Sequence, residues 1–322
     1  MKLNIAIPTY NRGAYLRRAI ESILDHADEL PIGISLSVCI YDNLSSDDTP
    51  AICADLQARE PTLQVVRHAV NIGGDANILR GLMDADGDYV WVLGDDDYLR
   101  SGTLAKLCEL LMTRKFDVIK MGAIEERDFK FGILTPPQAQ KSALTHDLTV
   151  ENFASPTSIL NRFGMSLGNF STMIFARSFF HTFYQTASAA LFKSGYSQLA
   201  WIYRGLKERS TRFGFIVEPL LVLRIEISPR DVSADQVHVG LDILRTHLIS
   251  MDYPVSTVDS FHSRQLDAIL LGHLKTRKMF GVPIWRELAA AWAGLSNGRQ
   301  RAKSLAIAAM PSGLYRWLWV RL

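Results

Sequence analysis

The chain has few cysteines and no long hydrophobic run. Its 322 residues include three cysteines, Cys39, Cys53 and Cys108, which are far apart and form no CxxC pair. Because they lie in apolar-patterned segments, we expect buried thiols in a reducing compartment. No apolar stretch approaches the ~20 residues of a membrane-spanning helix, and a strand pattern starts at the N-terminus without a signal peptide. The sequence therefore predicts a cytoplasmic protein, or one that rests on a membrane from the cytoplasmic side.

Internal repeats, low-complexity tracts, a P-loop and a GxGxxG fingerprint are also absent. The lack of both glycine-rich loops argues against a mononucleotide kinase and a dinucleotide-binding enzyme. The composition, with 48% hydrophobic and 21% charged residues, is that of an ordinary folded protein. A chain of this length buries a large core, as one large domain or as a main domain with an appendage.

Charge is unevenly distributed, although the net charge is only +2. Residues 262–322 contain 10 Lys and Arg against two acids, Asp267 and Glu287, which gives this tail +8 and leaves −6 for the remainder. A basic tail on an acidic body predicts that the two parts meet different partners.

Strand and helix patterns alternate over the first 120 or so residues. Apolar runs of strand length are separated by segments with helical spacing, and the predicted strands are 3–8, 34–41, 63–67, 89–93 and 117–121. This alternation predicts an α/β fold, Rossmann-like, with a mostly parallel sheet and helices on both faces.

Beyond residue 122 the pattern loosens. We expect a long surface excursion at 125–157, a strand at 213–225 with an edge or bulge at Pro219, and a loop at 227–236. Helical spacing recurs at 178–190 and 196–207, and the last 60 or so residues also read as helices.

The stretch 88–99 reads DYVWVLGDDDYL and ends a predicted buried strand with Gly94 and three acids, Asp95, Asp96 and Asp97. Ligand sites of open α/β sheets lie beyond the carboxyl ends of the strands. Three adjacent carboxylates repel one another unless a cation shares them. Oxygen ligands suit Mg²⁺ or Mn²⁺, with substrate phosphate oxygens completing the shell. The competing interpretation is a solvated acidic turn that caps the next helix.

Polar clusters also follow the three preceding strands, at 9–12, 42–49 and 71–77. Turns favour Asn, Asp, Ser and Gly on backbone grounds alone. Four such clusters at one edge of a single sheet nevertheless indicate a binding site.

Four strings resemble a known family: IAIPTYNRGAYLRRAIESIL, YDNLSSDDT, NIGGDANILRGL and GDYVWVLGDDDYL. In order and spacing they cover residues 3–120 or so, and jointly they resemble the GT-A nucleotide-sugar glycosyltransferases of family 2. The resemblance implies a GT-A catalytic domain over 1–240, with a nucleotide-sugar-binding half (1–122) and an acceptor half (123–240). A basic, aromatic, helical C-terminal extension would follow over 241–322.

The resemblance also implies site residues by position. In that family the divalent cation, Mn²⁺ or Mg²⁺, bridges the donor diphosphate to the acidic motif, so the implied catalytic and metal-binding carboxylates are Asp96 as ligand and Asp97 in the shell around it. The implied nucleotide-sugar site, with Asp95 near the ribose, consists of Pro8, Thr9, Tyr10, Arg12, Asp42, Asn43, Asn71, Gly74, Asn77 and Asp95.

Two positions depart from the family pattern. Gly94 stands at the first acidic position of the common D-x-D-D motif, so the triplet shares its work differently. Asn43 stands where a second acid often follows Asp42. A carboxylate accepts the N3 proton of uracil, whereas an amide donates to the bare N3 of cytosine. We therefore expect a donor of UDP or CDP type, and our hypothesis is a CDP-sugar. Tight binding of UDP with weak binding of CDP would contradict this hypothesis.

Inverting transfer also needs a base that takes the proton of the acceptor hydroxyl. The family commonly places an acid at the start of a helix in the second half, but the corresponding stretch here, 195–199, contains none. Asp231, in the loop after Arg224, is the base candidate that we name, with Asp235 and Glu226 as further ones. A solvated loop acid is the competing interpretation for each.

The tail interleaves aromatic with basic residues: Trp285, Trp292, Tyr315, Trp317 and Trp319 with Arg286, Arg299, Arg301, Lys303, Arg316 and Arg321. On amphipathic helices this pattern suits the surface of an anionic membrane, although the same side chains also pack on a catalytic domain. No nucleic-acid motif accompanies them, so we expect no nucleic-acid partner. Docking on the cytoplasmic face of the inner membrane fits a glycan or polyprenyl-linked acceptor, as in bacterial O-antigen or capsule assembly. The second half weakly resembles transferases of deoxysugars such as abequose.

These inferences predict a metal-dependent, inverting glycosyltransferase of hexosyl or deoxyhexosyl type. A catalytically inactive nucleotide-sugar-binding protein is the first alternative, because the base is unassigned. A nucleotidyltransferase is the second, disfavoured because no glycine-rich phosphate loop follows the first strand.

Overall fold

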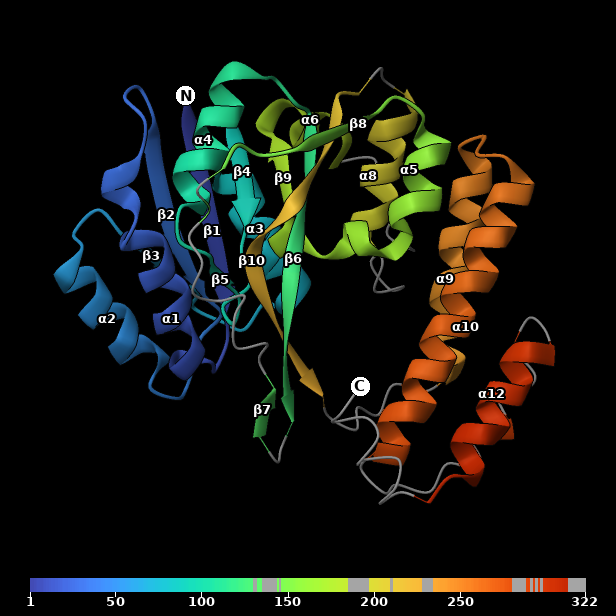
Figure 1. Cartoon of the computed structure of the whole chain (residues 1–322). Helices are drawn as coiled ribbons and strands as arrows, with labels where there is room; N and C mark the ends of the chain where they lie inside the picture. The colour runs from blue at the N-terminus through green and yellow to red at the C-terminus, as the bar shows by residue number, and fades with distance from the viewer. Residues whose placement is uncertain are drawn as a thin grey trace.

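The computed structural model describes residues 1–129, 132–134, 144, 146–184, 197–208, 211–227, 234–279, 288–289, 292, 295 and 298–311. A 10-stranded sheet runs through the centre, helices cover both of its faces, and the C-terminal helices stand to one side (Figure 1). The sheet is parallel in its first half and mixed in its second. The predicted α/β class with a helical C-terminal part is confirmed.

The first half of the chain alternates strands and helices as predicted. Its elements are β1 (Lys2–Thr9), α1 (Gly13–Leu24), η1 (Ala27–Glu29), β2 (Ser35–Asp42), α2 (Thr49–Arg59), β3 (Gln64–Arg67), α3 (Gly74–Asp84) and β4 (Tyr89–Val92). The strands lie in the order β3-β2-β1-β4 and are all parallel. Their carboxyl ends therefore open at one edge, where the four polar clusters follow them.

The second half extends this sheet with strands of both directions. Its elements are β5 (Tyr98–Leu99), α4 (Thr103–Thr113), β6 (Val118–Phe129), β7 (Gly132–Leu134), β8 (Val150–Phe153), α5 (Pro156–Phe163), η2 (Gly164–Gly168), η3 (Phe170–Thr172), β9 (Met173–Ala176), α6 (Arg177–Phe183), α8 (Ser197–Glu208) and β10 (Phe213–Ile227). β9 lies antiparallel between β4 and β6. The pairing of β6 with β10 shifts register on both sides of Pro219, so the predicted bulge is confirmed.

The expected surface excursion at 125–157 is partly wrong. β6 runs on to Phe129 against β10, and β7, β8 and the start of α5 also fall in this range. The polar residues of β6 are compatible with a strand because they find partners. Glu126, buried at 2% exposure, accepts a hydrogen bond from the Tyr98 hydroxyl at 2.7 Å and lies 3.4 Å from an Arg18 nitrogen. The expected loop at 227–236 ends where α9 begins at Ala234, and residues 228–233 lie outside the described part.

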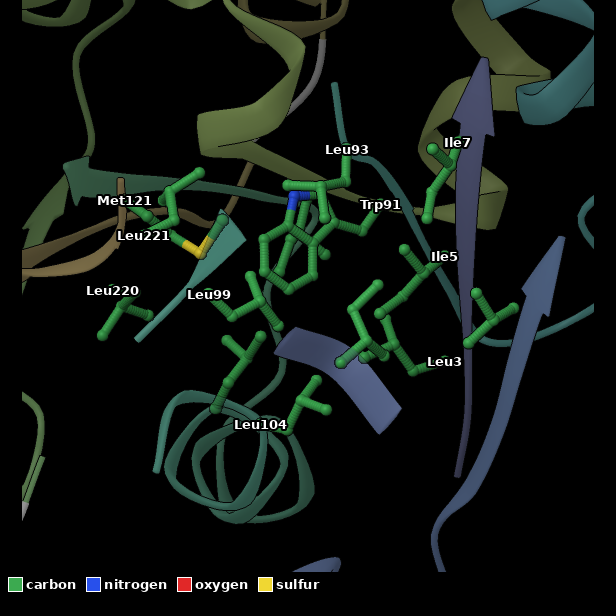
Figure 2. Packing of buried hydrophobic residues seen from close by; sticks show 14 of the residues in the cluster. Leu3, Ile5, Ile7, Trp91, Leu93, Leu99, Leu104, Met121, Leu220 and Leu221 are labelled. Atoms are coloured by element: carbon green, nitrogen blue, oxygen red, sulfur yellow. The ribbon is translucent and has the colours of Figure 1, made fainter. Parts of the chain in front are cut away.

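Two hydrophobic clusters pack on opposite faces of the sheet. Successive side chains of a strand point to opposite faces, so Ile5 of β1 packs on one face and Ala6 on the other. Trp91 of β4 is fully buried at the centre of the first cluster (Figure 2). Its indole nitrogen donates to the Ser171 carbonyl at 2.8 Å, which fastens η3 to the central strand. The three cysteines are buried and free, as predicted.

The C-terminal helices are α9 (Ala234–Ser250), α10 (Val255–Met279) and α12 (Gly298–Ala309). Leu244 and Leu248 of α9 pack into the second sheet cluster, whereas Leu270 of α10 and Ile307 of α12 belong to a third cluster. The predicted division after residue 240 falls inside α9, and the domain boundaries stay a prediction. No helix in the described part of the chain is long and apolar enough to cross a membrane.

Candidate functional site

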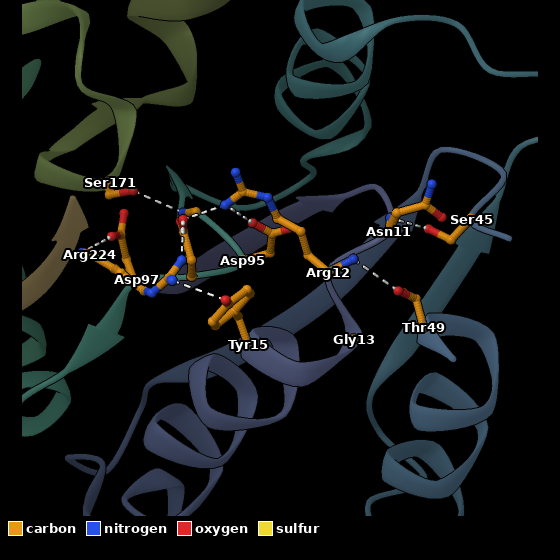
Figure 3. A network of polar contacts seen from close by, with 12 residues as sticks. Asn11, Arg12, Gly13, Tyr15, Ser45, Thr49, Asp95, Asp97, Ser171 and Arg224 are labelled. Carbon is orange, nitrogen blue, oxygen red and sulfur yellow. Dashed lines mark hydrogen bonds and ion pairs between the residues drawn. The ribbon is translucent and has the colours of Figure 1, made fainter. Parts of the chain in front are cut away.

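The turns after β1 and β2 are tied together at the edge of the sheet (Figure 3). Asn11 has a φ of 54°, a left-handed conformation that asparagine tolerates better than most residues. Its side-chain oxygen accepts from the Ser46 backbone amide at 2.7 Å, and its backbone amide donates to the Ser45 hydroxyl at 2.9 Å. The Arg12 amide donates to the Thr49 hydroxyl at 3.2 Å. The turn that carries Arg12 is thus built jointly by two loops.

The predicted nucleotide residues at the start of this edge differ in exposure. Thr9 is buried at 3% exposure, and Tyr10, which follows it, is 46% exposed. Pro8 lies between buried residues on β1 and is half-buried. Tyr10 is therefore the side chain of this group that offers an open aromatic surface.

The second and third loops meet through Asn43, which is buried. Its amide nitrogen donates to the Asn71 side-chain oxygen at 2.9 Å, and its side-chain oxygen accepts from the Ile72 amide at 2.8 Å. Asp42, also buried, accepts from the Ser45 amide at 2.9 Å. One of the two N–H donors of Asn43 is therefore engaged with the chain, and recognition of cytosine by this side chain stays a prediction.

Asn77 serves as an anchor of α3. Its amide nitrogen donates to the Tyr41 carbonyl at 2.9 Å, and its oxygen lies 2.8 Å from a ring nitrogen of His68. Gly74, at the first turn of the same helix, has open space where a side chain would begin. The structure thus uses Asn77 to hold α3 against β2 and leaves the backbone at Gly74 approachable. A role of either residue in nucleotide binding stays a prediction.

The three carboxylates after β4 are gathered around two guanidinium groups (Figure 3). Arg12 contacts the Asp96 carboxylate and lies 3.7 Å from an oxygen of Asp95. Arg224, on β10, places a guanidinium nitrogen 3.9 Å from Asp96, and its amide donates to Asp97 at 2.9 Å. Arginine side chains therefore offset part of the repulsion expected within the triplet, at Asp95 and Asp96.

Burial still disfavours negative charge on two of these acids. It raises the pKa of Asp95 to about 7, with the charge of Asp96 as a smaller contribution in the same direction. Burial likewise raises the pKa of Asp97 to about 6, again with help from Asp96. A site whose carboxyls are held partly protonated near neutral pH gains from additional positive charge.

Arg224 is a site residue that the sequence pattern did not indicate. Its side chain is 6% exposed. Its guanidinium carbon lies 3.8 Å from the ring centroid of Tyr15, and a nitrogen donates to the Tyr15 hydroxyl at 2.9 Å. The available signal was a basic residue within the apolar run LLVLRIEI, since an arginine there is buried only when it is paired.

Binding of a divalent cation by the acidic triplet stays a prediction. In the described part of the chain no three His, Cys, Asp or Glu side chains converge to hold a metal ion by themselves. Mg²⁺ in phosphate-transfer sites is commonly bound by one or two carboxylates plus the substrate phosphates. Asp96, with its side chain 17% exposed, suits that arrangement. Gly94 permits the tight turn, because a Cβ there would meet an Asp97 oxygen at 2.8 Å.

The described structure does not place any of the candidate catalytic bases in the site. Asp231 lies outside the described residues. Residue 235 falls in α9 and Glu226 in β10. α8, which starts at Ser197, has no acid in its first turn, as the sequence led us to expect.

Part of the basic, aromatic tail lies in the described chain. Trp292 is 38% exposed, and the Arg301 guanidinium carbon lies 5.9 Å from its ring centroid. Arg299 and Lys303 of α12 are exposed, whereas Ile307 packs toward α10. The helix is therefore amphipathic, with basic residues outward. The other tail residues named above lie outside the described part.

The model of the family described as "Glycosyl transferase family 2" matches residues 4–174. Abequosyltransferase RfbV of Salmonella typhimurium is 35% identical over 109 residues, which are 33% of this chain and 32% of that protein. The GalNAc(5)-diNAcBac-PP-undecaprenol beta-1,3-glucosyltransferase of Campylobacter jejuni is 33% identical over 109 residues, 34% of each chain. The match thus spans about a third of the length of these curated relatives.

Among solved structures, S. aureus TarS 1-349 in complex with UDP superposes with a TM-score of 0.59, over 98% of this chain and 92% of that one. The sequences are 16% identical, so this likeness shows the fold. The family model covers more than half of the chain, including all four strand-end clusters. The protein belongs to glycosyl transferase family 2, with the GT-A fold that the sequence predicted.

Proposed function

We propose that the protein is a glycosyltransferase that moves a sugar from a nucleotide diphosphate, with inversion, to a hydroxyl of a glycan or lipid-linked glycan. Family membership supports the reaction class. One relative is named for abequosyl transfer and another for an undecaprenol-linked glycan, which supports a role in bacterial O-antigen or capsule synthesis. The observation that carries the proposal is the convergence of Arg12, Arg224 and the acidic triplet at the edge where parallel strands end.

The base and ribose of the donor would lie along the loops after β1, β2 and β3. Asp42 and Asn43 are buried there, the exposed Asn71 accepts a hydrogen bond from Asn43, and Tyr10 offers an exposed ring. UDP and CDP both fit this chemistry, and solved TarS structures contain UDP or UDP-GlcNAc. The proposal for the base of the sugar donor rests on the hydrogen-bond donors and acceptors of these side chains.

The diphosphate leaving group would lie between the acidic triplet and the arginines. A divalent cation, Mn²⁺ or Mg²⁺, held by Asp96 with Asp97 beside it, would supply stabilisation of the leaving-group charge. Arg12 and Arg224 bring fixed positive charge to the same place, and guanidinium groups bind phosphate oxygens in bidentate fashion. Arg12 and Arg224 also lie beside the carboxylates, so donor binding would exchange one set of ion pairs for another.

Transfer itself breaks the bond between the anomeric carbon and the diphosphate oxygen. The acceptor oxygen forms the new bond to that carbon from the opposite side, its proton passes to a base, and the bond electrons leave with the diphosphate. Asp231 is the base that we propose to test. The Asp231→Asn variant should retain donor binding and lose turnover, because an amide does not accept the proton.

Because the proposed acceptor is linked to a lipid, we propose that the protein works at the cytoplasmic face of the inner membrane. The exposed basic face of α12 and the basic composition of the tail favour contact with anionic lipid headgroups. Binding to vesicles that contain anionic lipid, lost at high salt, is the expected result. Equal binding to neutral vesicles would contradict it.

The proposed reaction is tested by nucleotide release. Purified protein is incubated with UDP- and CDP-sugars, Mn²⁺ and a lipid extract of bacterial membranes, and free nucleoside diphosphate is measured. We expect turnover with one nucleotide class, reduced about 100-fold or more in Asp96→Asn and in Arg224→Met, in line with the loss of electrostatic stabilisation in other enzymes. Nucleotide binding without any release would favour the inactive binding protein. Pyrophosphate release from a nucleoside triphosphate would favour the nucleotidyltransferase.

A further inference from the structure

Lys120 is a buried lysine that none of the roles above uses. It lies on β6 and is 7% exposed, although lysine is almost never buried to this extent unless it is paired with an acid. In the described part of the chain no carboxylate forms an ion pair with its ammonium group. Burial lowers the pKa of Lys120 to about 8, so the group is mostly charged at neutral pH. Burying this charge costs free energy, which an apolar side chain at the same strand position would avoid.

The neighbours of Lys120 within the sheet are apolar. Val118 lies two residues earlier on the same face of β6 and is fully buried. Met173 of β9 and Phe215 of β10 are the register partners of Lys120 on the two adjacent strands. These side chains offer the ammonium group no charged or hydroxyl partner, so its hydrogen bonds are made to another segment.

The ammonium group binds the segment 164–172, which contains the two 3-10 turns η2 and η3. Its Nζ donates to the Ser166 carbonyl of η2 at 3.1 Å and to the Thr172 hydroxyl of η3. The Thr172 hydroxyl in turn donates to the Asn169 carbonyl at 2.9 Å, so its oxygen is oriented to accept from the lysine. One side chain of β6 thus holds both turns.

Side chains of three elements position the segment 164–172. Short 3-10 turns have poorer backbone hydrogen bonds than an α-helix, so contacts from outside matter more. Besides the lysine, the Tyr203 hydroxyl of α8 donates to the Gly164 carbonyl at 2.9 Å. The Trp91 indole of β4 donates to the Ser171 carbonyl at 2.8 Å. The lysine is the charged member of this set, and hydrogen bonds to charged groups are stronger than those between neutral groups.

The end of the segment supports the acidic turn. The Ser171 hydroxyl accepts from the Gly94 amide at 2.9 Å, and Ser171 lies beside Asp97 (Figure 3). Burial raises the pKa of Asp97, and the Ser171 side chain acts against this effect. Thr172, which Lys120 binds, is the next residue in the chain. A displacement of η3 would therefore also displace the support of Gly94 and Asp97.

We propose that Lys120 is a positioning residue for the acidic turn, on which it acts through Thr172 and Ser171. The inference rests on the proposed function, because this turn is where the diphosphate and the cation would bind. The ammonium group bonds to η2 and η3 and not to the carboxylates, so its effect reaches the site through the segment 164–172. A buried group that breaks the apolar pattern of its strand is expected where function requires a fixed geometry.

Hydrogen exchange of the acidic turn tests this effect without nucleotide or metal. The peptide 93–98 is followed by mass spectrometry at pH 7 with EDTA in the wild type, Lys120→Met and Thr172→Val. We expect exchange at least about 10-fold faster in both variants, through the loss of a hydrogen bond to a charged group. Thr172→Ser keeps the hydroxyl and should exchange like the wild type. Unchanged exchange in Lys120→Met, or equal exchange in Thr172→Ser and Thr172→Val, would overturn the proposal.

Val118→Ala is the matched control for lost packing. It removes two buried methyl groups from the same face of the same strand, so it should lower the midpoint of urea unfolding. The hydrogen bonds of Lys120 stay in place in this variant, and the peptide 93–98 should exchange at the wild-type rate. Exchange as fast as in Lys120→Met would indicate general loosening of the sheet and would also overturn the proposal.

Titration calorimetry with UDP and CDP, each with Mn²⁺, connects the turn to the proposed reaction. We expect a Kd at least about 10-fold higher in Lys120→Met and an unchanged Kd in Val118→Ala and Thr172→Ser. Faster exchange in Lys120→Met with an unchanged Kd would overturn the positioning role. Faster exchange together with no nucleotide binding by the wild type would support the link between Lys120 and the turn, and would contradict the proposed transfer instead.

Discussion

Asp95→Asn should stabilise the metal-free protein at neutral and higher pH. The carboxyl has an ordinary pKa of ~3.9 in an unfolded chain, and burial raises its pKa to about 7 in the folded protein. Between these pH values the folded state binds more protons than the unfolded state. The stability contributed by the wild-type carboxyl is therefore full below pH 4, falls as pH rises toward 7, and is constant above it.

The magnitude follows from the size of the shift. Three pH units at 1.36 kcal/mol each give ~4 kcal/mol as an upper limit. Asp95 is coupled to Asp96 and Arg12, and those groups readjust when the charge is removed. We therefore expect about half of that limit, ~2 kcal/mol, in favour of asparagine at pH 8.

Urea unfolding with EDTA at pH 5, 6, 7 and 8 measures this difference. The advantage of Asp95→Asn over wild type should grow from pH 5 to pH 7 and then level off. The control is Asp28→Asn, which removes an exposed acid of η1 and should show no pH-dependent gap. A gap that is independent of pH, or that favours wild type at pH 8, would refute the assigned cause. Asp95→Asn should also lose nucleotide binding. That loss would indicate that the acid is retained for function and not for stability.

Three further predictions concern packing and charge. Gly81→Ala should destabilise the fold by about 1–3 kcal/mol in urea unfolding, because the added Cβ would lie 2.7 Å from the Ala6 Cβ. The control Gly272→Ala has open space around the added Cβ and should stabilise α10 slightly. Equal effects of the two substitutions on the free energy of unfolding would contradict this prediction. Burial lowers the pKa of Lys120 to about 8, so wild type should gain stability relative to Lys120→Met as pH rises from 8 to 10, and a falling difference would be the wrong sign. Arg224→Lys should keep the charge but lose the planar group that stacks on Tyr15, with nucleotide release at least about 10-fold below wild type. Full activity of this variant would remove Arg224 from the site.

The sheet of the first half was predictable because its signals are local. Apolar runs of strand length such as 89–93 and helical spacing in α1 can be read within a dozen residues. β6 could be followed only as far as Met121, since Glu125 and Glu126 interrupt the apolar pattern. Their place in a strand depends on β10, about a hundred residues later in the chain, and no local pattern contains that pairing.

The candidate site shows the same limit. Strand ends with Asp, Asn and Gly located the four loops, because the carboxyl ends of parallel strands share one edge. The partner of Asp97 could not be predicted in this way, since the Arg224 amide that binds it is 127 residues away. The anchoring role of Asn77 was likewise invisible, because it depends on the Tyr41 carbonyl of a neighbouring strand.

The central claim is that the edge around Asp96 binds a nucleoside diphosphate together with a divalent cation. Thermal unfolding with UDP, CDP, GDP and dTDP, each with Mn²⁺ and with EDTA, tests it most directly, since a ligand that binds only the folded state raises the melting temperature. The account predicts an increase for UDP or CDP that requires Mn²⁺ and vanishes in Asp96→Ala, with Asp28→Asn unchanged. No increase with any nucleotide, or an equal increase in Asp96→Ala, would contradict it.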